Sequence, residues 1–222
     1  MNVIVFGATG MVGAGVLTEC LEDPRVQSVL VVGRRPCGIA HPKLRELILS
    51  DFFDYSDAKT DLTGHDACFF CLGVSAAGMT EATYHRLTYD LTLSAAEALA
   101  DLNPGLTFCY VSGEGTDSTE RGRFMWARVK GKTENHLLRM PFHAYMFRPG
   151  FIQPLKGARS KTKLYQAFYS ILGPIFPLLK RLLPSHLTTT VNVGRAMIQV
   201  AASGYSKRVL ENPDINVLAT KV

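Results

Sequence analysis

Short apolar runs alternate along the chain with longer stretches in which apolar residues recur at helical spacing. Nearly continuous apolar runs are typical of strands that are buried on both faces of a parallel sheet. Such runs predict strands at Asn2–Phe6, Val29–Val32, Leu47–Leu49 leading into Asp51 and Phe52, Ala67–Leu72, Leu106–Ser112 and Tyr145–Phe147. Helices are predicted up to about Glu22, from Glu81 to Leu102, and over Arg123–Leu138. This order predicts an α/β fold with a doubly wound, mostly parallel sheet.

The alternation stops after Gly150. We therefore predict a core over residues 1–150, and a small helical substrate cap with closing elements over 151–222, within one compact domain. The cap contains an uncharged run, Leu164–Leu179, which is too short to span a bilayer and is interrupted by Pro174 and Pro177. Three interpretations of segment 164–183 stay open: a hydrophobic lid, a core or homodimer surface, or an interfacial segment on an anionic membrane.

Composition narrows the class of protein. The chain has 222 residues, of which 47% are hydrophobic and 19% charged, and this is typical of one folded domain. Five cysteines without a tight framework predict reduced thiols and a cytoplasmic protein, and the strand-like N-terminus predicts no signal peptide. Cys68 and Cys71 form a C-x-x-C inside an apolar run, so we interpret them as buried apolar residues. The histidines lack ligand spacing, and no metal site is predicted.

Positive charge is concentrated in the second half of the chain. Residues 121–181 contain thirteen Lys or Arg and one acidic residue, Glu134. Such a region is found in proteins that bind nucleic acids, anionic membranes or phosphate-bearing ligands. Few aromatic residues are spaced for base stacking, so no nucleic-acid partner is predicted. A basic loop contains Lys156, Arg159, Lys161 and Lys163 and is either solvated or in contact with an anionic substrate or with cofactor phosphates.

A glycine motif, GATGMVG, directly follows the first predicted strand and opens a helix. Gly7 permits the tight turn, Gly10 lets the backbone approach a pyrophosphate, and Gly13 lets the helix pack close to the sheet. The helix N-terminus supplies free N–H groups to the phosphates. The motif predicts a Rossmann dinucleotide site that also includes Ala8, Thr9, Met11 and Val12.

The end of the second strand bears on which dinucleotide binds. An NAD site usually has a carboxylate there, whereas this chain has Arg34 and Arg35, which can grip a 2′-phosphate. We therefore predict NADP(H). Because ligands lie at the carboxyl ends of such strands, we also place Asp51 with Phe52 near the adenine. The adenosine ribose is expected beside Cys71, Leu72 and Gly73, although strand-end packing explains these last residues nearly as well.

Taken together, these motifs resemble a known family. The glycine motif, the arginine pair and the segments CLG, YVS, VKG and RPG occur in the order seen in atypical short-chain dehydrogenases. The small epimerase/NmrA-like branch that includes the Tat-interacting-protein oxidoreductases is the most similar. The resemblance implies an active-site lysine at Lys130 and an active-site serine at Ser112. It also implies that Arg148, Pro149 and Gly150 flank the nicotinamide.

One departure concerns the proton donor. The family pattern has Tyr four residues before the lysine, on the same helix face, whereas this chain has Trp126. An indole N–H cannot act as an acid and base near neutral pH. Other groups that could supply the proton are Tyr84, Tyr89, His136, Tyr165 and Tyr169.

Three functions follow as hypotheses. The first is an NADPH-dependent oxidoreductase that acts on a small, mostly apolar carbonyl-type compound through Lys130. The second is a non-catalytic NADP(H)-binding redox sensor that acts through a protein partner, because a sensor tolerates Trp126 in place of Tyr. The third is a binding module for membranes or nucleic acids, suggested by the basic stretch.

Overall fold

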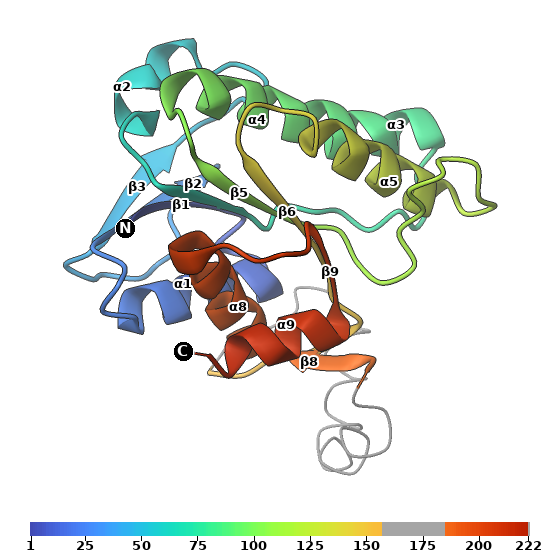
Figure 1. Cartoon of the computed structure of the whole chain (residues 1–222). Coiled ribbons are helices and arrows are strands. Elements are labelled where there is room, and N and C mark those ends of the chain that lie inside the picture. The colour runs from blue at the N-terminus through green and yellow to red at the C-terminus, as the bar shows by residue number, and fades with distance from the viewer. Residues whose placement is uncertain (157–184, 222) are drawn as a thin grey trace.

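The computed structural model describes residues 1–156 and 185–221, and its centre is a seven-stranded parallel sheet (Figure 1). The strand order is β3-β2-β1-β4-β5-β6-β9, and every neighbouring pair runs parallel. The strands are β1 (Asn2–Phe6), β2 (Ser28–Gly33), β3 (Leu44–Ile48), β4 (Ala67–Phe70), β5 (Thr107–Val111), β6 (His143–Arg148) and β9 (Val209–Glu211).

Helices cover both faces of the sheet (Figure 1). One face carries α1 (Met11–Glu22), α8 (Thr190–Ser203) and α9 (Asn212–Ala219); the other carries α2 (Lys59–Leu62), α3 (Glu81–His85), α4 (Leu91–Leu102) and α5 (Met125–Leu137). Successive side chains of a strand point to opposite faces. Accordingly, Val3 and Val5 join the buried cluster under α1 and α8, while Ile4 and Phe6 join the cluster under α4. The predicted doubly wound α/β fold is confirmed.

Several predicted elements differ from the structure in their bounds or in their helical geometry. The third strand is Leu44–Ile48, so Asp51 and Phe52 lie in the turn after it. This edge strand contains exposed and partly buried residues and no buried one, so it lacks the continuous apolar run by which strands were predicted. The predicted helix over Glu81–Leu102 is continuous but contains a π-helical turn, η2 (Arg86–Asp90), between α3 and α4. The last predicted strand extends to His143–Arg148 because it pairs along β5.

The described residues after Gly150 pack against the core. β7 (Phe151–Gln153) and β8 (Leu187–Thr189) form a small parallel sheet, and β9 adds a seventh strand to the main sheet beside β6. Helix α8 packs closely on α1, because a Cβ on Gly15 would lie 2.4 Å from the Cβ of Thr190. The sequence predictions did not find these elements. Segment 164–183, with its three interpretations, lies outside the described residues.

Among residues 1–156 and 185–221, no helix is both long enough and apolar enough to cross a bilayer.

Candidate functional site

The order of the sheet reverses at β1, whose two neighbours are β2 and β4. In doubly wound sheets, ligands bind at such a switch point, outside the carboxyl ends of the strands. A cavity of about 370 Å³ opens there. Its lining includes seven of the residues predicted for the dinucleotide: Gly7, Ala8, Thr9, Arg34, Arg35, Phe52 and Leu72.

Two glycines of the motif hold the turn at this cavity. Gly7 has a φ of +80°, and a Cβ there would lie 2.8 Å from the backbone of Cys71 and Leu72. A Cβ on Gly13 would lie 2.2 Å from the carbonyl oxygen of Gly7. The tight turn predicted at Gly7 and the close helix packing predicted at Gly13 are therefore both present. These contacts bring the start of α1 against the end of β4.

The N-terminus of α1 is suited to an anion. Gly10 is its N-cap residue and provides no side-chain cap, and the first turn contains no acidic residue. The first N–H groups of a helix and its dipole favour negative charge. A Cβ on Gly10 would have one close neighbour, the Gly7 carbonyl oxygen at 3.3 Å, so the glycine leaves open backbone at this point. These features fit a bound pyrophosphate.

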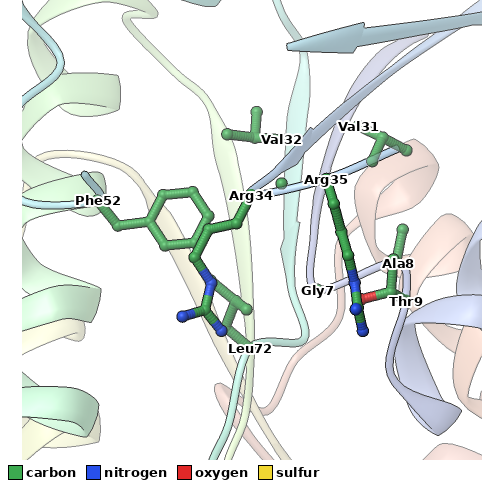
Figure 2. Close-up of a pocket in the computed structure, with 10 residues that line it drawn as sticks. Gly7, Ala8, Thr9, Val31, Val32, Arg34, Arg35, Phe52 and Leu72 are labelled. Carbon is green, nitrogen blue, oxygen red and sulfur yellow. The ribbon is translucent and has the colours of Figure 1, made fainter. Parts of the chain in front are cut away.

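Arg34 and Arg35 extend from the end of β2 into the same cavity. Figure 2 shows Arg34 on the side of Phe52 and Leu72, and Arg35 on the side of Thr9, with both guanidinium groups directed toward the same end. Both residues are exposed. Within residues 1–156 and 185–221, neither forms an ion pair. The pair is therefore open to an anionic ligand.

Other residues predicted for the adenosine end do not line this cavity. The Asp51 carboxylate accepts a hydrogen bond of 2.8 Å from the backbone N–H of Phe53, within its own turn. Phe52 contributes to the lining in its place. Cys71 packs against the core beneath α1, and Gly73 is exposed.

A second cavity, of about 470 Å³, contains the residues predicted for the reacting end of the cofactor. Among its lining residues are Val12, Ser112, Glu114, Lys130, Pro149 and Gly150. Because Gly7–Thr9 line the first cavity and Val12 lines the second, the two cavities flank the N-terminus of α1. The predicted serine, lysine and Pro-Gly pair thus meet, although they come from β5, α5 and the end of β6.

Lys130 is fixed toward the end of β5. Its ammonium group donates a hydrogen bond to the backbone carbonyl of Ser112. Burial lowers the pKa of Lys130 to about 8, and the carboxylate of Glu134, one helical turn further along α5, partly opposes that shift. A lysine in this setting exchanges protons near neutral pH far more readily than a solvated one.

Glu134 is a member of this site that the sequence analysis missed. Its side chain is 1% exposed and forms a salt bridge with Arg148, whose Nε lies 3.0 Å and 3.1 Å from the two carboxylate oxygens. The Ser112 hydroxyl donates a hydrogen bond to the same carboxylate. The Arg148 guanidinium is thus committed to Glu134 and is absent from the cavity lining. A signal was present, since Glu134 follows Lys130 by four residues and is the single acidic residue between Arg121 and Arg181.

Trp126 lies one turn before Lys130 on α5, as the spacing predicted. Its indole packs against Gly115, where a Cβ would lie 3.4 Å from the ring. Trp126 does not line the Lys130 cavity, and neither do Tyr84, Tyr89 or His136. The Tyr89 hydroxyl instead forms a 2.7 Å hydrogen bond with His136. Tyr165 and Tyr169 lie outside the described residues.

Two further predictions concern charge and metals. Lys156 forms ion pairs with Glu19 at 2.6 Å and Glu22 at 2.5 Å, so it contacts α1, while the other three residues of the basic loop lie outside the described part. In residues 1–156 and 185–221, no group of three His, Cys, Asp or Glu side chains is placed to hold a metal ion.

Burial raises the pKa of Cys71 to about 12, which keeps it a thiol.

Comparison with known proteins gives relatives in fungi. The chain is 30% identical over 191 residues to the mitochondrial protein fmp52 of Emericella nidulans, covering 81% of this chain and 79% of that protein. It is also 30% identical over 167 residues to the mitochondrial protein FMP52 of Saccharomyces cerevisiae, covering 73% and 69%. No family model matches the sequence.

Among solved structures, the chain resembles a dTDP-glucose 4,6-dehydratase from Streptomyces venezuelae with NAD bound. The TM-score is 0.68 at 16% identity, and the similarity covers 100% of this chain and 80% of that one. At this identity the similarity shows the fold, which is the Rossmann fold of the NAD-binding dehydratase.

The names of the relatives overturn one prediction. Both fungal proteins are named mitochondrial, so the cytoplasmic location inferred from the cysteines is wrong. Free cysteines argue against an oxidising compartment, but they do not distinguish one reducing compartment from another.

Proposed function

The chain belongs to the FMP52 family, and from this premise we propose that it is an NADP(H)-dependent oxidoreductase of a small, apolar carbonyl-type compound. We also propose that the chain is similar to the Tat-interacting-protein branch of atypical short-chain dehydrogenases. One observation carries it: an arginine pair and the turn that leads into the uncapped N-terminus of α1 line one cavity, and a lysine of lowered pKa lines the next.

Each cavity would hold a different part of the dinucleotide. Arg34 and Arg35 would bind the 2′-phosphate, and the first N–H groups of α1 would bind the pyrophosphate. Lys130 would hold the ribose at the reacting end, beside Pro149 and Gly150. When bound, the dinucleotide supplies the hydride. The protein's part is to orient the carbonyl compound, exclude water and deliver a proton.

The proposed cofactor preference is tested by the double variant Arg34→Ala/Arg35→Ala. Loss of charge-assisted hydrogen bonds to the 2′-phosphate is expected to weaken NADPH binding by about 10- to 100-fold and to leave NADH binding unchanged. Affinities are measured by nicotinamide fluorescence and by energy transfer from Trp126, the single tryptophan. Arg45→Ala, an exposed arginine on β3 outside the cavity, is the matched control. Equal losses for both dinucleotides would contradict NADP(H) preference.

The alternative is a non-catalytic redox sensor that binds NADP(H) and acts on a protein partner. Trp126 in place of a tyrosine favours it. Turnover of an apolar carbonyl compound that disappears in Lys130→Ala would exclude the sensor. Tight NADPH binding without turnover of any compound in a broad panel would favour it.

A further inference from the structure

Among residues 1–156 and 185–221, no tyrosine lines the Lys130 cavity, but a carboxylate does. Three of its lining residues have groups that can exchange protons: Ser112, Glu114 and Lys130. The Ser112 hydroxyl donates to buried Glu134, and the Lys130 ammonium donates to the Ser112 carbonyl. Glu114 is left as the acidic group that faces the cavity.

A histidine contacts the Glu114 carboxylate. The ring Nδ1 of His186, immediately before β8, is hydrogen-bonded to the Glu114 carboxylate. The backbone holds both residues in place: the N–H of Glu114 donates to the Pro149 carbonyl at 2.9 Å, and the N–H of Phe151 donates to the His186 carbonyl at 2.8 Å. We call these two residues the Glu114–His186 pair.

Gly150 lets the pair meet at the cavity wall. A Cβ on Gly150 would lie 2.7 Å from Oε2 of Glu114 and 2.4 Å from the carbonyl oxygen of His186. Gly150 itself lines the cavity, so the second carboxylate oxygen of Glu114 lies at the cavity surface. This gives the glycine of the RPG segment a role that the resemblance did not include.

Exposure distinguishes this pair from the buried one beside it. The side chains of Glu114 and His186 are 43% and 57% exposed, whereas those of Glu134 and Arg148 are 1% and 12% exposed. The Glu114–His186 pair therefore reaches both the cavity and the solvent. A proton can pass from water to the His186 ring, from there to Glu114, and then into the cavity.

We propose that the Glu114–His186 pair performs the proton exchange that Trp126 cannot, with Glu114 as a catalytic residue and His186 as its proton relay. This rests on the proposed function. Before the reduction, Nε2 of His186 takes a proton from water while the Nδ1 proton of the same ring passes to the Glu114 carboxylate, so the ring stays neutral. As a carbonyl compound is reduced, its C=O π bond breaks and its oxygen takes that proton from the Glu114 carboxyl group. Exchange with water then restores the Nδ1 proton of His186. The electron pair and the carbon-bound hydrogen come from NADPH, which becomes NADP⁺.

The first experiment measures the protonation of the His186 ring in the Glu114–His186 pair, without any substrate. Nitrogen-15 spectra of the histidine rings are recorded for the full chain, with His186→Asn for assignment. We expect Nδ1 of His186 to be protonated in the wild type and to lose that preference in Glu114→Ala, because the carboxylate fixes this tautomer. His41, whose ring accepts a hydrogen bond from Lys43 in an exposed loop, is the internal control and should not change.

NADP⁺ is then added to the same samples. Its binding is expected to shift the His186 signals in the wild type, because Glu114 lines the cavity in which the nicotinamide is proposed to lie. In Glu114→Gln and His186→Asn, NADP⁺ affinity should stay within about twofold. The kcat for any carbonyl compound that the wild type reduces should fall by about 100-fold or more, a loss typical of removing an acid–base group. Glu97→Gln, exposed on α4, should keep wild-type kcat.

Three outcomes would overturn the proposal while the proposed function stands. In the first, NADP⁺ binds without moving the His186 signals. In the second, Glu114→Ala leaves the tautomer unchanged, and in the third, Glu114→Gln keeps wild-type kcat. Failure of NADP⁺ to bind at all would instead overturn the proposed function, and this proposal with it. All three variants of the pair alter partly exposed side chains, so we expect them to fold, and the histidine spectra report this directly.

Discussion

The surroundings of Lys130 show how a folded protein changes the chemistry of one side chain. Its ammonium is held by the Ser112 carbonyl, and burial lowers its pKa to about 8. The lysine was predicted from its place in the family motif. The lowered pKa was not predictable, because it depends on the depth at which α5 packs beside β5.

The lowered pKa should appear in the stability of the protein. Between about pH 8 and the ordinary value of 10.5, the unfolded chain binds a proton at Lys130 that the folded protein does not. The free energy of unfolding should therefore gain a contribution that increases with pH across this window. Lys130→Met removes that contribution. Urea denaturation at pH 7 to 10 should show the wild type gaining stability relative to the variant.

Lys59→Met provides the control for this experiment. Lys59 is exposed at the start of α2, and its substitution should leave the difference from the wild type flat with pH. A flat difference for Lys130→Met as well would mean that the folded protein titrates Lys130 like a solvated lysine.

At the scale of elements, the contact between the β1–α1 turn and the start of α1 shapes the first cavity. The glycine spacing predicted this turn because the steric partner of Gly13 is local: a Cβ there would meet the carbonyl oxygen of Gly7. The Arg34–Arg35 pair lines the first cavity because it directly follows β2. The location of Asp51 was less accurate, because the edge strand β3 ends earlier than its apolar residues suggest.

Gly13→Ala tests the contact between α1 and the turn. The added Cβ would lie 2.2 Å from a backbone oxygen, so α1 must move away from the turn. We expect a loss of about 1–3 kcal/mol in the free energy of unfolding, together with weaker NADPH binding. Gly73→Ala is the matched control, because a Cβ there meets nothing within 4 Å. Thermal melts and NADPH titrations are measured on both variants. Equal results for Gly13→Ala and Gly73→Ala would contradict the contact between α1 and the turn.

At the scale of the whole molecule, the C-terminal residues belong to the core. Leu210 on β9 and Ile215 on α9 are fully buried in the cluster beneath α1 and α8. Glu211 on β9 also reaches Arg148, with 3.2 Å between their charged groups. β9 therefore forms one edge of the sheet beside β6, the strand that leads into the second cavity.

Leu210→Ala tests this arrangement. Removing a fully buried leucine side chain should lower the free energy of unfolding by about 2–5 kcal/mol. Val217→Ala lies in the same segment, but Val217 is 50% exposed, so its effect should stay within about 0.5 kcal/mol. Urea denaturation of the two variants gives the comparison. Equal effects of the two substitutions would mean that β9 does not pack into the core at the edge of the sheet.

The sequence alone determined the α/β class, the glycine turn and the position of the arginine pair, because each depends on periodicity or on neighbours within a few residues. The lysine came from the resemblance to a known family. Only the tertiary structure decided the rest. It brought Glu114 to His186 and Glu134 to Arg148, and it joined β9 to β6. These partners are separated by 72, 14 and about 60 residues, and their meeting depends on which strands and helices lie side by side. Residue spacing along the chain carries no signal for such contacts.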